Sequence, residues 1–198
     1  MRPVTILVLL SFTLSVPGCA KKGGSESSAS LSGYDGRVKE KVLADEGLLL
    51  QAIDLDRDGQ AEIFNYFRER ADAARLLVRK ELDLNRDGKV DIVSWFDDSG
   101  NLEREEMDGD YDGHFDWTDH YNEGLRVMSE YDTDNDGTPN VWKYYNVGDD
   151  GVARLDRKER DTDGDGKIDV WERFNEQGEV VRTGKDTDGD GKMDIREE

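Results

Sequence analysis

Carboxylate side chains recur at alternate positions in six short segments of this 198-residue chain. These segments, called loops 1 to 6, read DLDRDGQAE, DLNRDGKVD, DGDYDGHFD, DTDNDGTPN, DTDGDGKID and DTDGDGKMD. Each has an acid or asparagine at the first, third, fifth and ninth places and a glycine at the sixth. Oxygen ligands on alternate residues, with a glycine that turns the backbone, suit a hard divalent cation. We expect calcium, because magnesium demands strict octahedral geometry and keeps its waters.

The predicted ligands occupy the same four places in every loop. They are Asp54, Asp56, Asp58 and Glu62; Asp83, Asn85, Asp87 and Asp91; Asp108, Asp110, Asp112 and Asp116; Asp132, Asp134, Asp136 and Asn140; Asp161, Asp163, Asp165 and Asp169; and Asp186, Asp188, Asp190 and Asp194. These places hold 22 of the 47 acids in a chain of net charge −20. Much of the negative charge therefore belongs to predicted calcium ligands. Disorder is predicted for the calcium-free chain only.

Loops 5 and 6 match the EF-hand calcium motif D-x-[DN]-x-[DN]-G-x5-E to its end. The match places Glu172 and Glu197 at the twelfth place, and Lys167 and Lys192 at the seventh, where the backbone carbonyl ligates. Loop 3 has Asp119 at its twelfth place. The twelfth residues of loops 1, 2 and 4 are asparagine, serine and lysine, so there the ninth residue or water must complete the coordination.

The Asp-rich loops over residues 54–198 resemble those of bacterial secreted calcium-binding repeat proteins, including thrombospondin type-3-like repeats and EF-hand-like loops. The segments between the loops do not share the resemblance, and the cysteines of thrombospondin type-3 repeats are missing there. What the resemblance implies is an extracytoplasmic module for binding or scaffolding, stabilised by calcium. Up to six calcium ions are expected as partners.

The segments between the loops indicate β-hairpins rather than helices. After loop 5, for example, the strand-like run 170–174 is followed by a turn at Gly178 and a second strand-like run to residue 185. We therefore predict a mainly β fold, in which calcium loops and hairpins stack as a solenoid-like array with aromatic side chains packed between repeats. A sugar-stacking role for those aromatics stays open as an alternative.

Two segments at the start of the array are less regular. Residues 34–53 are predicted to form a degenerate capping hairpin, ahead of six repeats that begin at 54, 83, 108, 132, 161 and 186. After loop 1, Ile63, Phe67, Ala74 and Leu77 lie near helical spacing. EF-hand-like helix–loop–helix pairs, at least around loop 1, are thus the alternative fold.

The N-terminal residues are expected to direct export. Residues 1–18 combine Arg2 with a short apolar run, which is typical of a signal peptide. The segment Val-Pro-Gly-Cys19 resembles a bacterial lipobox, which implies that Cys19 is acylated and anchors the chain to a membrane. Residues 19–33 form a Gly/Ser-rich tether. Ala20 after the cysteine resembles an outer-membrane address, on the periplasmic face or the cell surface.

Composition excludes several other functions. The acidity argues against nucleic-acid binding, and a single cysteine excludes a disulfide framework. Neither His114 nor His120 has a motif that pairs it with a nucleophile, so no catalytic residue and no enzyme activity are predicted. The main expectation is a lipid-anchored structural or interaction module, with an envelope protein or polysaccharide as partner. The alternatives are an EF-hand-type sensor that exposes a partner surface, and a carbohydrate-binding or hydrolytic envelope protein.

Overall fold

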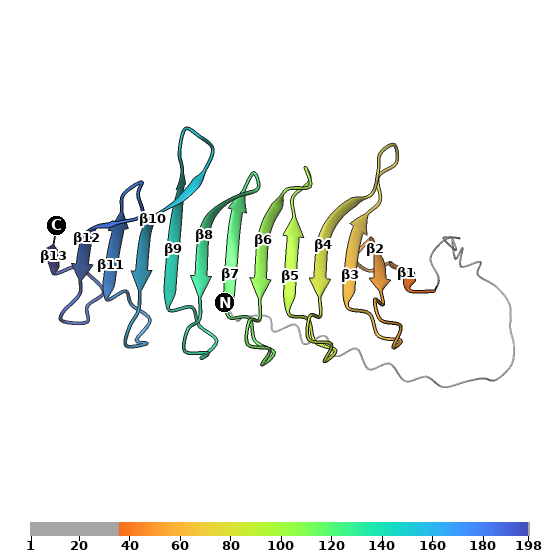
Figure 1. Cartoon of the computed structure of the whole chain (residues 1–198), viewed down its shortest axis with the longest axis horizontal. Helices are drawn as coiled ribbons and strands as arrows, with labels where there is room; N and C mark the ends of the chain where they lie inside the picture. The colour runs from red at the N-terminus through yellow and green to blue at the C-terminus, as the bar shows by residue number, and fades with distance from the viewer. Residues whose placement is uncertain (1–35, 198) are drawn as a thin grey trace, which may run out of the picture. The chain divides into compact units, whose positions relative to one another are not determined.

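The computed structural model describes residues 36–197, which form a single antiparallel sheet of thirteen strands in chain order (Figure 1). The strands are β1 (Val38–Leu43), β2 (Leu48–Ile53), β3 (Ile63–Arg68), β4 (Leu76–Leu82), β5 (Ile92–Phe96), β6 (Leu102–Met107), β7 (Trp117–Asn122), β8 (Leu125–Tyr131), β9 (Val141–Val147), β10 (Ala153–Arg160), β11 (Val170–Phe174), β12 (Val180–Lys185) and β13 (Ile195–Glu197). The predicted β class is confirmed. No helix occurs between residues 36 and 197, so none in that range is long and apolar enough to cross a membrane.

The six Asp-rich loops all lie at one end of the strands, because each connects an even-numbered strand to the next odd-numbered one. Figure 1 shows them in a row along the lower end, with the hairpin turns along the upper end. Neighbouring strands lie about 4.8 Å apart, so successive loops recur roughly every 10 Å. The sheet therefore arranges the loops as a linear series.

The hairpins follow the strand–turn–strand pattern read from the sequence. Gly100, Gly124, Gly151 and Gly178 adopt positive φ angles at their turns. Each of the five hairpins from β3–β4 to β11–β12 also carries a bulge at an equivalent register, with one extra residue on its second strand. After loop 1, β3 and β4 occupy the segment for which a helix was the alternative, so the hairpin pattern holds there as well.

The hairpins join edge to edge, which differs from the expected stack of repeats. The ninth-place N–H of every loop donates to the carbonyl of the last residue of the preceding strand, at 2.7–3.1 Å. This bond holds the two ends of the loop at strand-pairing distance, so the next strand continues the same sheet. Side chains at the tenth and fourteenth places, such as Trp117 and Tyr121, alternate along one strand and so share one face, but they are partly exposed there rather than packed between repeats.

A polar row crosses the sheet at the twelfth place. Cross-strand pairing connects Glu40, Gln51, Asn65, Lys80, Ser94, Glu105, Asp119, Ser129, Lys143, Lys158, Glu172, Thr183 and Glu197. Several neighbours in this row bond directly: the Ser94 hydroxyl donates to Glu105 at 2.7 Å, and the Ser129 hydroxyl to Asp119 at 2.5 Å. Side-chain hydrogen bonds thus tie adjacent strands together across this line of the sheet.

On the opposite face, arginines stack on aromatic rings of the neighbouring strand. The guanidinium carbon of Arg79 lies 3.8 Å from the ring centre of Tyr66, that of Arg104 lies 4.5 Å from Trp95, and that of Arg157 lies 4.0 Å from Tyr144. Each arginine also pairs with a glutamate two residues on. These contacts shield the rings in the way that a second layer would in a sandwich.

Few apolar side chains are buried in the described part of the chain. They are Leu49, Tyr66, Leu76 and Val93, and all four lie between β2 and β5. The buried polar side chains are more numerous, and most are acids of the loops: Asp54, Glu62, Asp83, Asp91, Ser94, Asp108, Asp119, Ser129 and Asp161. The buried side chains of the described residues are therefore mostly polar, and most of these belong to the loops.

Candidate metal centres

The six loops share one conformation, which the first-place aspartate organises. In each loop one carboxylate oxygen of that aspartate accepts the N–H of the sixth-place glycine at 2.6–3.0 Å. In all but loop 4, the other oxygen accepts the fourth-place N–H. The fourth and sixth residues both have positive φ, so the chain folds tightly around this carboxylate.

The ninth-place side chain closes each loop from the other side. One of its oxygens accepts the N–H of the second residue, at 2.5–3.1 Å in all six loops. In loops 5 and 6 the hydroxyls of Thr162 and Thr187 donate to the same oxygens, at 2.6 and 2.7 Å. The first-place carboxylates and the ninth-place side chains are therefore held in position by the backbone without a bound ion.

Carboxylate oxygens converge in five of the loops. In each group, one oxygen from every member lies within 4.8 Å of the others: Asp54, Asp56, Asp58 and Glu62; Asp108, Asp110 and Asp116; Asp132, Asp134 and Asp136; Asp161, Asp163 and Asp169; Asp186, Asp188 and Asp194. The donors are all oxygens, the set that calcium and magnesium prefer. Two unit charges about 4 Å apart repel by roughly 4 kcal/mol at an effective dielectric constant near 20. A bound cation would remove that repulsion.

The fifth-place acids of loops 3, 5 and 6 lie outside these groups, although the sequence pattern treats every loop alike. Asp165 and Asp190 pair with the seventh-place lysines of their own loops, Lys167 and Lys192, at 3.1 and 2.6 Å. Asp112 instead accepts hydrogen bonds from the side chain of Asn135 and from the backbone N–H and ring Nδ1 of His114. Only Asp58 and Asp136 join the groups from this place.

The twelfth-place residues also lie apart from the groups. Asp119, Glu172 and Glu197 are the third residues of β7, β11 and β13, within the polar row. Asp119 accepts the Ser129 hydroxyl, and one oxygen of Glu172 lies 3.7 and 3.6 Å from Lys158 and Arg160. In an EF-hand a helix carries the twelfth residue back to the ion, whereas here a strand begins at the tenth place and extends away from the loop.

Loop 2 contains the most buried carboxylate of the described chain. Asp91 is 1% exposed; its Oδ2 accepts the N–H of Leu84 at 2.5 Å and that of Asn85 at 3.2 Å, which directs the side chain into the loop. Its Oδ1 is buried and has no hydrogen-bond partner. The third place is Asn85, whose side-chain oxygen accepts the N–H of Asp87 just as the equivalent aspartates do elsewhere. Loop 2 therefore shares the fold of the other loops with one charge fewer.

Hydrogen bonds within loops 5 and 6 also lower the pKa of three of their acids. The amide and hydroxyl of Thr162 hold the pKa of Asp169 below its ordinary value, and Thr187 does the same for Asp194. Burial acts to raise the pKa of Asp186, but the backbone N–H groups of Gly191 and Gly189 outweigh it, so this pKa is also lowered. The ionised form of these three carboxylates, which is the form that binds a cation, is therefore favoured.

Consecutive loops are linked to one another. The first-place N–H of each following loop donates to the ninth-place carbonyl of the loop before it, at 2.7–3.0 Å. Side chains add further bridges: Arg86 reaches Asp56 at 2.7 Å, Lys89 reaches the Asp112 carbonyl at 3.3 Å, and Lys167 reaches the Gly189 carbonyl at 2.5 Å. Backbone and side-chain hydrogen bonds therefore connect each loop to the next.

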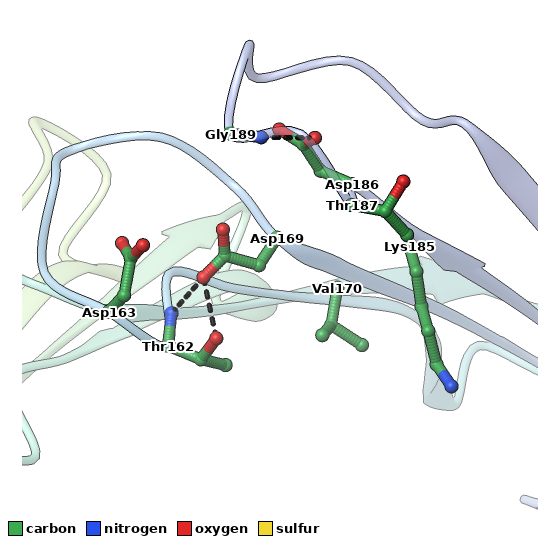
Figure 2. Close-up of a pocket in the computed structure, with 8 residues that line it drawn as sticks. All are labelled: Thr162, Asp163, Asp169, Val170, Lys185, Asp186, Thr187 and Gly189. Carbon is green, nitrogen blue, oxygen red and sulfur yellow. Dashed lines mark hydrogen bonds between the residues drawn. The ribbon is translucent and has the colours of Figure 1, made fainter.

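A cleft of about 300 Å³ lies between loops 5 and 6. Figure 2 shows Asp163 and Asp169 on the loop 5 side, with Thr162 donating to Asp169, and Asp186 on the loop 6 side. A second cleft, lined among others by Asp116 and Asp132, lies between loops 3 and 4. The acids of adjacent loops therefore face shared, water-accessible space.

Some contributing residues were not anticipated from the sequence. The threonines at the second place bond the ninth-place side chain, and the fourth-place residues Arg86 and Asn135 bridge to the preceding loop. The recurrence of threonine at the second place in loops 4 to 6 is a signal that could have identified the first contact. The bridges depend on how the loops align across the sheet, which the sequence pattern does not specify.

The predicted signal peptide, the acylated Cys19 and the tether lie outside the described residues. No model of a known protein family matches the chain, and no curated protein matches it either. The interpretation of the loops therefore rests on their own geometry and on the chemistry of their donor atoms.

Proposed function

We propose that this protein is a calcium-binding, lipid-anchored module of the cell envelope whose sheet is stabilised by the ions in its loops. The observation that carries the proposal is the convergence of carboxylate oxygens in repeated loops whose backbone already holds them in place. Calcium is favoured over magnesium because a loop of side-chain oxygens with room for water suits its larger, more flexible coordination shell.

The burial of charged side chains supports a structural role for the ions. Six acids at first and ninth places are buried, whereas only four apolar side chains are buried among residues 36–197. These acids are Asp54, Glu62, Asp83, Asp91, Asp108 and Asp161. Buried charge is costly unless it is compensated. An ion that binds only the folded state adds about 2.7 kcal/mol at a hundred times its Kd, so several ions would stabilise the folded sheet substantially.

Chelation tests the calcium part of the proposal. Circular dichroism of the protein in calcium should show a strand-rich spectrum and a cooperative melt, and excess chelator should lower the melting temperature and reduce the strand signal. Magnesium at the same concentration serves as the control and should restore less of the lost stability. An unchanged spectrum and melting temperature after chelation would contradict the proposal.

Anchoring is a separate part of the proposal and needs its own experiment. In a bacterial host the full chain should partition into detergent and show a mass increase from acyl chains on Cys19. Replacing this residue, Cys19→Ser, should release a soluble or unprocessed form. If the unmodified chain stays soluble with a free thiol, the lipid anchor is wrong while calcium binding is unaffected.

A further inference from the structure

We propose that loop 2 holds the most tightly bound ion of the series, even though it has fewer acids than any full match to the motif. The inference rests on the proposed calcium binding and concerns a loop that is not among the five convergent acid groups. The expected ligands are carboxylate oxygens of Asp83 and Asp91 and the side-chain oxygen of Asn85. The ligand class is a single hard divalent cation.

The unpartnered oxygen of Asp91 is the first reason. This carboxylate is 1% exposed and its Oδ1 accepts no hydrogen bond, while its Oδ2 is bonded inside the loop. A buried carboxylate oxygen that accepts no hydrogen bond is unfavourable, so a cation that coordinates Oδ1 would relieve a cost that exposed carboxylates do not carry. The gain should appear as higher affinity at this loop.

The surroundings of loop 2 supply the second reason. Asp83 is 7% exposed, and the Asp91 carbonyl accepts the N–H of Asp108, which is itself 2% exposed. The following strand places Val93 and Ser94 among the most buried side chains of the sheet. Charge attraction to an ion is screened less by water in such a place. In contrast, the ninth-place Asp194 of loop 6 is exposed and its loop is next to the short edge strand β13.

The loop with the highest calcium affinity should therefore not be the loop that best matches the EF-hand motif. Loop 6 fulfils the EF-hand motif, but its twelfth-place Glu197 lies in β13 and outside the acid group. Loop 2 deviates from the motif at the third and twelfth places, yet it has the buried and uncompensated donor. Preorganisation and burial outweigh one formal charge here, because exposed carboxylates lose much of their attraction to solvent screening.

The test compares two ninth-place variants of the full chain, Asp91→Asn and Asp194→Asn, by calcium titration against a chromophoric chelator. The unaltered protein should show one tight ion, with a Kd at least about tenfold below the others, a gap of roughly 1.4 kcal/mol. Asp91→Asn should abolish the tight ion. Asp194→Asn should remove one weak ion and leave the tight ion unchanged.

A second pair of variants guards against misfolding of Asp91→Asn. Asn85 is exposed, so Asn85→Ala should fold and raise the Kd of the tight ion, while Asn85→Asp should lower it. The inference is overturned if the tight ion persists in Asp91→Asn and Asn85→Ala, if Asp194→Asn removes it, or if all ions bind equally. Absence of any bound calcium in the unaltered protein would instead overturn the proposed function itself.

Discussion

The fourth residue of each loop has a left-handed backbone conformation, which is strained for residues other than glycine. Loops 5 and 6 have glycine there, whereas loops 1 to 4 have Arg57, Arg86, Tyr111 and Asn135 at φ angles of 60–72°. An L-residue in this region costs about 1–2 kcal/mol, and a glycine gives back roughly 0.5–1 kcal/mol of that through its greater freedom in the unfolded chain.

We expect Tyr111→Gly to stabilise the protein by about 0.5–1 kcal/mol, since the tyrosine is 45% exposed and loses little contact. Urea unfolding in saturating calcium measures the change. The reciprocal control is Gly166→Ala, at φ 85° with no atom within 4 Å of the added methyl, which should destabilise by about 1 kcal/mol. Destabilisation by Tyr111→Gly would show that the tyrosine ring contributes more than its backbone strain costs.

Tyr66 should make stability depend on pH in the alkaline range. Burial raises the pKa of Tyr66 to about 12, with help from Glu81, which accepts its hydroxyl at 2.7 Å. Because the pKa is higher in the folded than in the unfolded protein, the stabilisation is complete below pH 10 and is lost as pH rises toward 12. The unfolding free energy of the unaltered protein should therefore fall relative to that of Tyr66→Phe between these values. Parallel curves would contradict the shifted pKa.

The strand that follows each loop determines whether the twelfth-place acid lies near the loop. Glu172 is the third residue of β11 and faces Lys158 and Arg160, whereas Asp169 belongs to the acid group of loop 5. Glu172→Gln should leave the number of bound calcium ions unchanged and cost less than about 1 kcal/mol, as expected for a partly exposed ion pair. Asp169→Asn should remove one ion. Isothermal titration calorimetry counts the bound ions in the two variants. Loss of an ion in Glu172→Gln would contradict the prediction and indicate an EF-hand-like geometry, in which the twelfth residue is a ligand.

The local pattern of the sequence was sufficient for the loops and the hairpins, but not for their assembly. Gly178 and the tenth-place β-branched residues act through short-range geometry, so turn and strand could be predicted from them. Whether Phe174 packs between layers or lies on an open face depends on non-local pairing, here on the bond from the ninth-place N–H to the preceding strand. For the same reason the twelfth-place Glu172 matched a ligand motif although a strand carries it away from the loop.

Buried apolar and buried polar side chains are unevenly distributed along the described sheet. The buried apolar side chains lie in β2 to β5, while the buried side chains beyond Val93 are polar: Ser94, Asp108, Asp119, Ser129 and Asp161. Each hairpin contacts mainly its neighbours in the sheet, as in repeat proteins, so stability is expected to vary along the chain. The C-terminal hairpins are therefore expected to depend on bound ions more than on hydrocarbon packing.

Lowering calcium in steps should therefore open the described sheet from its C-terminal side. We expect the amides of β9 to β12 to lose hydrogen-exchange protection first and those of β2 to β5 last, because only the latter retain buried apolar contacts and the buried loop 2 carboxylates. Hydrogen exchange with mass spectrometry at a series of buffered calcium concentrations resolves the order. In Asp91→Asn, the amides of β4 and β5 should lose protection at a higher calcium concentration than in the unaltered protein. In Asp194→Asn, only the amides of β12 and β13 should be affected. Simultaneous loss across all strands would mean that the linked loops make the sheet one cooperative unit, with the ions distributed through it rather than added to a stable end.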